Sequence, residues 1–148
     1  MRKLSAQARQ TPAYSHDEVA FNYRMTNLNA AVGMAQLERL DEMLAAKRAL
    51  AEIYDAALSG RRDLVPMPRR DWARSSHWLY AVLSPSKDDA AALVAHLAAR
   101  AIESSIFWLS LSQQAPYANC PRQLSGVARD ISGRVVVLPS SSSLASED

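Results

Sequence analysis

The sequence predicts an α/β fold of the α+β-like kind, with one long helix, a short sheet of three strands, and one or two further helices on one face. Three observations support this prediction. A helical pattern without proline runs from residue 27 to residue 58, short runs of aromatic and branched residues alternate with polar loops, and the segment from 88 to 101 is amphipathic. The 148 residues make up about one domain.

The longest helical pattern begins after Thr26 and ends before Gly60. Thr26 or Asn27 can cap its start with a side-chain oxygen, and Gly60 suits a left-handed C-terminal stop. At 1.5 Å per residue, the pattern predicts a rod of roughly 45 Å. Steps of mostly three or four residues predict one buried stripe. Its members are Ala31, Val32, Ala35, Leu37, Leu40, Leu44, Leu50, Ile53, Tyr54, Ala57 and Leu58.

Other apolar residues of this helix spread around more than one of its sides, and they are Leu28, Met34, Leu37, Met43 and Leu44. A small sheet cannot bury all of them. We therefore expect an exposed apolar face that a second subunit or a further domain covers, and association of the isolated chain.

The remaining elements follow in order. Residues 61–76 read as a surface connection because Pro66 and Pro68 cannot lie inside a helix. Residues 77–83 predict a buried strand, and residues 88–101 predict a helix whose buried side is formed by Ala91, Leu93, Val94, Leu97 and Ala98. A second strand is expected within 102–111, a short helix within 125–132, and a last strand over 135–138.

The composition is that of an ordinary globular protein, with 49% apolar and 22% charged residues. A net charge of +2 disfavours binding to nucleic acid or to an acidic membrane. The single cysteine, Cys120, excludes an internal disulfide and suits the reducing cytoplasm. We find neither a signal peptide nor an apolar run of membrane-spanning length. The four glycines do not form a phosphate-cradling loop, so any phosphate contact must come from side chains.

One stretch is distinctive, the run HDEVAFNYRMTNLNAAVGMAQLERLDE from His16 to Glu42. It resembles the segment that follows the catalytic-lysine region in the DegT/StrS-type sugar aminotransferases. The resemblance implies a pyridoxal-phosphate enzyme that places an amino group on a nucleotide-linked keto-sugar. The spacing of later segments is similar to the subgroup that acts on UDP-linked 4-keto-6-deoxy-N-acetylhexosamines. Two departures are the Ala20-Phe21 pair before the NYR triplet and Ser105-Ile106 where the family commonly has Arg-Pro.

The resemblance also implies a domain organisation. Residues 1–26 would be a motif-bearing segment of the large domain, and residues 27–148 would be the C-terminal small domain of a fold-type-I aminotransferase, truncated at its own C-terminus. The expected partners are the missing large domain, a second subunit in a homodimer, and a nucleotide-sugar in the complete enzyme.

The resemblance assigns cofactor contacts to the motif. The asparagine of NYR, Asn22 here, would hydrogen-bond the phosphate of pyridoxal 5'-phosphate in the neighbouring subunit, and Arg24 would assist it. In the simpler alternative, Asn22 caps a turn and Arg24 pairs with Asp17 or Glu18.

Transamination requires a lysine that bonds to the cofactor. Lys3, Lys47 and Lys87 do not stand in the family's context for that residue, and each is expected to be an ordinary surface lysine. No residue of this chain is therefore predicted to be catalytic, and the isolated chain is predicted to be inactive.

Two other function classes were weighed. A non-catalytic dimerisation fragment would keep the interaction surface without chemistry. A nucleic-acid binder using Arg61, Arg62, Arg69 and Arg70 is disfavoured by the nearly balanced charge. No metal site is predicted, because His16, His77, His96 and Cys120 lack the spacing of metal ligands.

Overall fold

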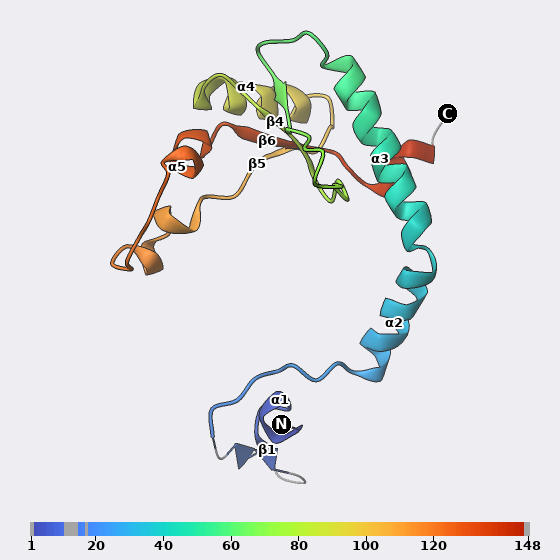
Figure 1. The fold of residues 1–148 in the computed structure, drawn as a ribbon, viewed down its shortest axis with the longest axis vertical. Coiled ribbons are helices and arrows are strands. Elements are labelled where there is room, and N and C mark those ends of the chain that lie inside the picture. Colours follow the sequence, from blue (N-terminus) through green and yellow to red (C-terminus); the bar gives the residue numbers. More distant parts are fainter. Residues whose placement is uncertain (1, 11–14, 17, 147–148) are drawn as a thin grey trace. The chain divides into compact units, whose positions relative to one another are not determined.

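The computed structural model describes residues 2–10, 15–16 and 18–146, and the chain divides into two compact units, Met1–Asp41 and Glu42–Asp148 (Figure 1). The helices are α1 (Arg2–Ser5), α2 (Asn27–Glu38), α3 (Leu40–Ala57), α4 (Lys87–Ala98) and α5 (Val127–Ile131). The strands are β1 (Arg9–Gln10), β2 (Ser15–His16), β3 (Val65–Pro66), β4 (Tyr80–Leu83), β5 (Ser105–Ile106) and β6 (Val135–Leu138). Helices accompany a small antiparallel sheet, so the predicted fold class is confirmed.

The sheet of the second unit has four strands in the order β3-β4-β6-β5, and all of its neighbouring strands are antiparallel. In the central pair, Tyr80 lies opposite Leu138 and Leu83 lies opposite Val135. Strand β6 has the predicted bounds. Strand β5 is much shorter than the predicted 102–111 segment. Strand β3 was missed because proline argued against a strand, although an edge strand tolerates proline.

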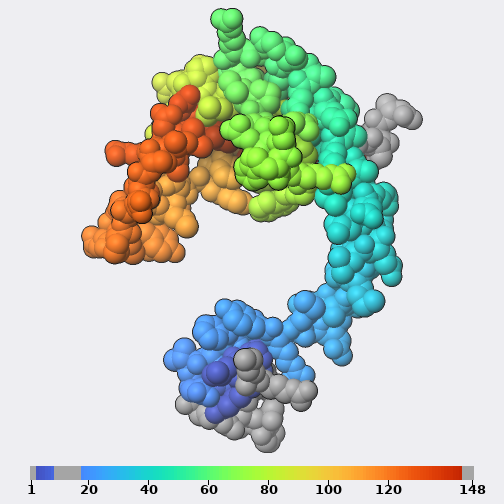
Figure 2. Space-filling model, viewed as in Figure 1, coloured from blue at the N-terminus to red at the C-terminus, as the bar shows by residue number. Residues whose placement is uncertain are grey.

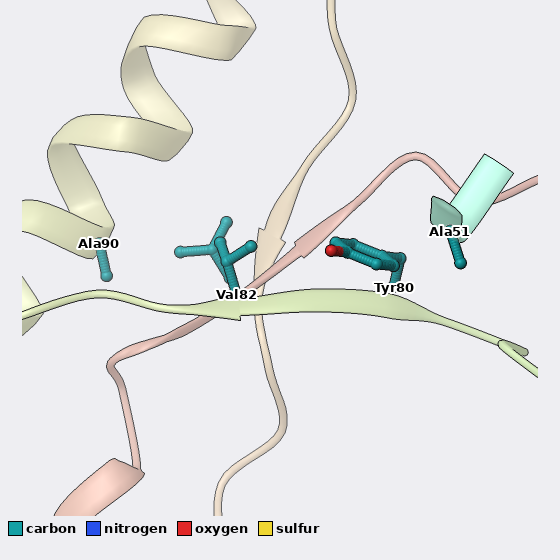
Figure 3. Close-up of a cluster of buried hydrophobic side chains, with 5 residues drawn as sticks. Ala51, Tyr80, Val82 and Ala90 are labelled. Carbon is teal, nitrogen blue, oxygen red and sulfur yellow. The ribbon is translucent and has the colours of Figure 1, made fainter. Parts of the chain in front are cut away.

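The core of this unit lies between one face of the sheet and two helices. Figure 3 shows Tyr80 and Val82 on the same side of β4, directed toward Ala51 of α3 and Ala90 of α4. These four side chains and Val136 are buried, and Leu93 and Val94 of α4 pack against them. Strand alternation explains the arrangement, because residues two apart face the same side. Both helices therefore cover one face, as predicted.

Helix α4 is shorter than predicted, and its buried face is shifted by about one residue along the sequence. Its buried residue is Ala90, whereas Ala91 and Ala98, which were expected to be buried, are exposed. The side chain of Ser86 caps the start of the helix by accepting a hydrogen bond from the Asp89 backbone N–H at 3.1 Å. Asp88 and Asp89 lie in the first turn, where the helix dipole favours negative charge.

The long rod is interrupted at Arg39, so the prediction of one continuous helix is wrong. Arg39 has φ −107° and ψ 6°, and its N–H donates to the carbonyls of Gln36 and Leu37 instead of continuing the α-helical pattern. Two helices result, α2 and α3. The predicted ends are confirmed: Thr26 Oγ1 accepts from the Asn29 N–H at 3.2 Å, and Gly60 has φ +79°.

The expected buried stripe exists only in α3. There Leu50 is buried and Leu44 and Tyr54 are half-buried; Ala51, which was not assigned to the stripe, is also buried, and Leu58, just after the helix, is half-buried. Other members are exposed, namely Ala31, Val32, Ala35, Leu37, Leu40, Ile53 and Ala57. Helix α2 has no buried residue, and its Leu28 and Met34 side chains are 74% and 65% exposed. The expected exposed apolar face is therefore confirmed on α2, whereas Met43 and Leu44 of α3 are half-buried. None of the helices formed by the described residues is long and apolar enough to cross a membrane.

Candidate functional site

The NYR motif lies in a loop that is bonded to the end of α1, within the first unit. The N–H groups of Tyr23 and Arg24 both donate to the carbonyl of Ser5, at 2.9 and 3.0 Å. The Phe21 N–H donates to the Leu4 carbonyl at 2.9 Å. The last carbonyls of a helix lack intrahelical partners, and the loop supplies partners for two of them. The backbone around Asn22 is therefore fixed by hydrogen bonds.

Aromatic stacking also orders this loop. The rings of Phe21 and Tyr23 have centroids 5.0 Å apart and planes 10° apart. Asn22 lies between them in sequence and forms an isolated β-bridge with Ala6. The residues on either side of position 22 thus stack on each other and its backbone is paired, which is a suitable arrangement for presenting a short amide side chain.

The side chains of Asn22 and Arg24 are exposed, and neither forms a hydrogen bond or ion pair with another described residue. Glu18, one of the alternative partners of Arg24, instead pairs with Lys3 at 3.1 Å. Asp17, the other alternative partner, lies outside the described residues. An amide NH₂ and a guanidinium are good donors to a phosphate oxyanion. The donor set is chemically suited to the cofactor phosphate that the family resemblance implies.

The expectation of an ordinary surface lysine is wrong for Lys47. Its half-buried ammonium donates to the Trp78 carbonyl at 3.2 Å and also to the Ser140 carbonyl. These carbonyls precede β4 and follow β6, which is the same end of the antiparallel pair, so Lys47 fastens α3 to one end of the central strands. Sequence periodicity could not reveal this role, because both acceptors are backbone atoms far away in the chain.

The other lysines and the histidines have separate surroundings. The Lys87 side chain lies against Gly133, where an added Cβ would be 3.2 Å from its Cε. His96 contacts Arg100, with His96 Nδ1 3.0 Å from the guanidinium, and Cys120 is exposed. Among the described residues, no group of three histidine, cysteine or acidic side chains is placed to hold a metal ion.

A partly exposed polar network that the sequence did not indicate joins α3 to β4. Tyr80 donates its hydroxyl to Asp55 Oδ1 at 2.6 Å, and Arg69 Nε donates to Asp55 Oδ2 at 2.8 Å. Burial acts to raise the pKa of Asp55, but hydrogen bonds from Tyr80 and Arg69 outweigh it and the pKa is lowered. Burial, and then the bond to Asp55, raise the pKa of Tyr80. The network stabilises the carboxylate form of Asp55.

The sequence of this chain is similar to those of known proteins. The model of the DegT/DnrJ/EryC1/StrS aminotransferase family matches residues 1–148. A GDP-perosamine synthase of Escherichia coli O157:H7 is 32% identical over 135 residues, which cover 90% of this chain and 36% of that protein. A UDP-4-amino-4,6-dideoxy-N-acetyl-beta-L-altrosamine transaminase of Campylobacter jejuni is 30% identical over 66 residues, which cover 45% of this chain and 18% of that protein.

The fold of the chain is also similar to that of solved proteins. The solved putative sugar aminotransferase Spr1654 of Streptococcus pneumoniae superimposes with a TM-score of 0.76 at 21% identity, over 96% of this chain and 37% of its own. That protein has been solved in apo, PLP and PMP forms. The chain thus spans little more than a third of the length of the E. coli relative and of this solved structure.

Proposed function

This chain belongs to the DegT/DnrJ/EryC1/StrS aminotransferase family, and we propose that it is part of a pyridoxal-phosphate-dependent enzyme that moves an amino group onto a nucleotide-linked keto-sugar. The family match over the whole chain is the observation that carries the proposal. The amino donor is an amino acid such as glutamate. The names of the relatives refer to GDP-linked and UDP-linked sugars. The proposal therefore covers nucleotide-linked sugars in general and does not choose between the two nucleotides.

The proposed contribution of this chain to the site is a pair of donors to the cofactor phosphate. When bound, pyridoxal phosphate supplies the electron sink for the transfer. Asn22 would donate its amide to the phosphate held by the neighbouring subunit, and Arg24 would add a charged fork or hold the loop in shape. The hydrogen bonds from the loop to Ser5 support this role, because a fixed backbone presents both donors at little entropic cost.

The second proposed contribution is a surface between subunits. The exposed apolar residues of the motif loop and α2 would be covered by a second copy or by the large domain, and they include Phe21, Tyr23, Met25, Leu28, Val32, Met34 and Leu37. A site completed across subunits needs such contact next to the phosphate donors. The same surface is the observation that favours the competing function, a non-catalytic dimerisation fragment.

A chimera tests the cofactor role. Residues 1–148 replace the matching segment of the E. coli GDP-perosamine synthase, so that the remainder of that enzyme supplies the lysine expected from the family resemblance. We expect the chimera to retain pyridoxal phosphate and Asn22→Ala to weaken retention roughly ten- to hundred-fold, because it removes one hydrogen bond to a charged group. Asn119→Ala, an exposed asparagine outside the motif, is the matched control and should retain the cofactor.

Mixed dimers then test the cross-subunit geometry. One subunit carries Asn22→Ala and an intact lysine, and its partner lacks the lysine but keeps Asn22. If Asn22 acts across the interface, one of the two sites holds cofactor normally. Loss of both sites, or unchanged affinity in Asn22→Ala, would show that the assigned role is wrong. A folded chimera that cannot hold cofactor would favour the dimerisation fragment.

A further inference from the structure

A groove of about 850 Å³ opens within the second unit, between α3 and the segment that follows β3. Its cationic lining residues are Arg48, Arg69, Arg70 and Arg74, and His77 also lines it. Figure 2 shows the green segment around residue 70 lying over part of α3. Hydrogen bonds from Arg69 to Asp55 and from Arg48 to the Ser75 carbonyl join the two walls. The groove does not include the motif loop, and the proposed cofactor role makes no use of it.

Several of these guanidinium groups are not engaged by carboxylates. Arg69 pairs with Asp55, and Arg48 Nε lies 3.5 Å from the Ser75 carbonyl oxygen. The exposed side chains of Arg70 and Arg74 have no hydrogen-bond or ion-pair partner among the described residues. Two carboxylates, Glu52 and Asp71, also line the groove, yet neither pairs with a described residue. The lining therefore carries more positive than negative charge, with two guanidinium forks free.

His77 gives an independent indication that the groove is a ligand site. The residue is only 7% exposed, and its Nδ1 atom has no hydrogen-bond partner among the described residues. Buried polar atoms in native proteins nearly always have partners, so such an atom needs an explanation. Its φ of +48° is in the left-handed region, which is uncommon for a residue other than glycine and is frequent at ligand sites.

The charge state of His77 agrees with this environment. Burial lowers the pKa of His77, the charges of Arg69 and Arg48 lower it further, and those of Asp55 and Glu52 oppose them. Its imidazole is thus favoured in the neutral form, in which one ring nitrogen donates and the other accepts a hydrogen bond.

We propose that this groove binds a phosphate-bearing anion, with Arg70 and Arg74 donating to its oxygens and with Arg48 and His77 forming part of the pocket. The planar guanidinium fork matches two oxygens of a phosphate group, and several forks suit an anion with more than one negative charge. A monocarboxylate would leave most of these donors unused. Asn22 and Arg24 are not among the lining residues, and the proposal does not depend on the proposed aminotransferase role.

Calorimetric titration of the whole 148-residue chain with inorganic pyrophosphate, at constant ionic strength, tests the proposal. We expect saturable binding that is at least about tenfold weaker when Arg70→Gln and Arg74→Gln are combined, because two charge-assisted hydrogen bonds are lost. Arg62→Gln is the matched control, since Arg62 is exposed and lies outside the groove. Trp72, which is 86% exposed and lies between the two arginines in sequence, provides a fluorescence signal that Trp72→Phe should remove.

A second variant separates recognition from folding. Arg70→Lys with Arg74→Lys keeps the charge but removes both forks, and it should weaken pyrophosphate binding while leaving the thermal melt unchanged. Absence of saturable binding, equal affinity in the double Gln variant, or an equal loss in Arg62→Gln would overturn the proposal. So would acetate binding as tight as that of pyrophosphate. Tighter binding of a single-stranded oligonucleotide would replace it with a nucleic-acid site, and inorganic phosphate shows whether one phosphate group suffices.

Discussion

Helices α2 and α3 are neighbours in sequence and both are rich in apolar residues, yet their burial is opposite. Helix α2 has no buried residue, and its Leu37 side chain is 67% exposed. Helix α3 buries Leu50, which is 8% exposed, and Ala51, which packs in the core with Tyr80 and Val82 of the sheet. The comparison shows that an apolar helical pattern predicts a face that needs a partner, but does not identify that partner.

The partner of α3 lies within this chain. Tyr80 of β4 stacks on Tyr54 with ring centroids 4.7 Å apart, and Lys47 bonds to carbonyls beside β4 and β6. For α2, the described residues provide no comparable covering. The stability of α2 in isolation therefore depends on the helix propensity of its residues and on the Thr26 cap. For a helix of twelve residues, that stability is marginal.

The largest expected difference between the helices is the cost of truncating one leucine in each. Leu50→Ala should lower the free energy of unfolding by about 2–5 kcal/mol, because it leaves a cavity at a buried position. Leu37→Ala should change it by no more than about 0.5 kcal/mol in the monomer. Urea denaturation of both variants measures the difference. Equal losses would show that α2 is packed within the monomer.

The sequence predicted those features that depend on local patterns. The strand over residues 135–138, the Thr26 cap and the left-handed Gly60 follow from residue type and spacing, and the structure confirms them. The break at Arg39 was missed because neither proline nor glycine marks it. It depends on backbone hydrogen bonds that no pattern of residue types shows.

For the candidate sites, the sequence supplied the motif but not the groove. Asn22 and Arg24 were found because the NYR run is contiguous. Their role stays a prediction. The groove brings together Arg48 and His77 from different parts of the chain, and the left-handed φ of His77 is visible only in the fold. Local sequence periodicity does not show which residues from distant parts of the chain come into contact.

Association should depend on α2 far more than on α3. The isolated chain is expected to form dimers at micromolar concentration, because burying one large apolar side chain contributes about 1.5–3 kcal/mol. Leu37→Glu should therefore weaken the dimer by at least about tenfold. Ile53→Glu, which changes an exposed apolar residue of α3, is the control and should have little effect. Sedimentation equilibrium measures both, and a clean monomer of the unmodified chain would contradict the assignment of α2 as the interface.

Acid sensitivity should come from the second unit. The folded-state pKa of Asp55 is depressed, so its contribution is present at neutral pH and is lost as the pH falls below about 4, through the folded pKa. Asp55→Asn should be less stable at pH 7, and the difference from the unmodified chain should shrink in acid. Urea denaturation at several pH values measures it. Glu18→Gln, which removes the exposed ion pair with Lys3, should change stability by no more than about 1 kcal/mol at pH 7. An Asp55→Asn difference that grows as the pH falls would contradict this sign.

The smallest expected difference involves the two capping hydroxyls. Thr26 Oγ1 and Ser86 Oγ accept from N–H groups at 3.2 and 3.1 Å, and Ser86 Oγ also donates to Asp89 Oδ2 at 2.6 Å. Ser86→Ala should lower the global stability of the second unit by about 1 kcal/mol, since α4 packs on the core. Thr26→Ala removes a similar interaction from a helix that buries nothing. It should therefore leave the cooperative transition unchanged and increase amide hydrogen exchange only within α2. If Thr26→Ala lowered the cooperative transition as much as Ser86→Ala, α2 would unfold together with the sheet, and the contrast between the two helices would fail.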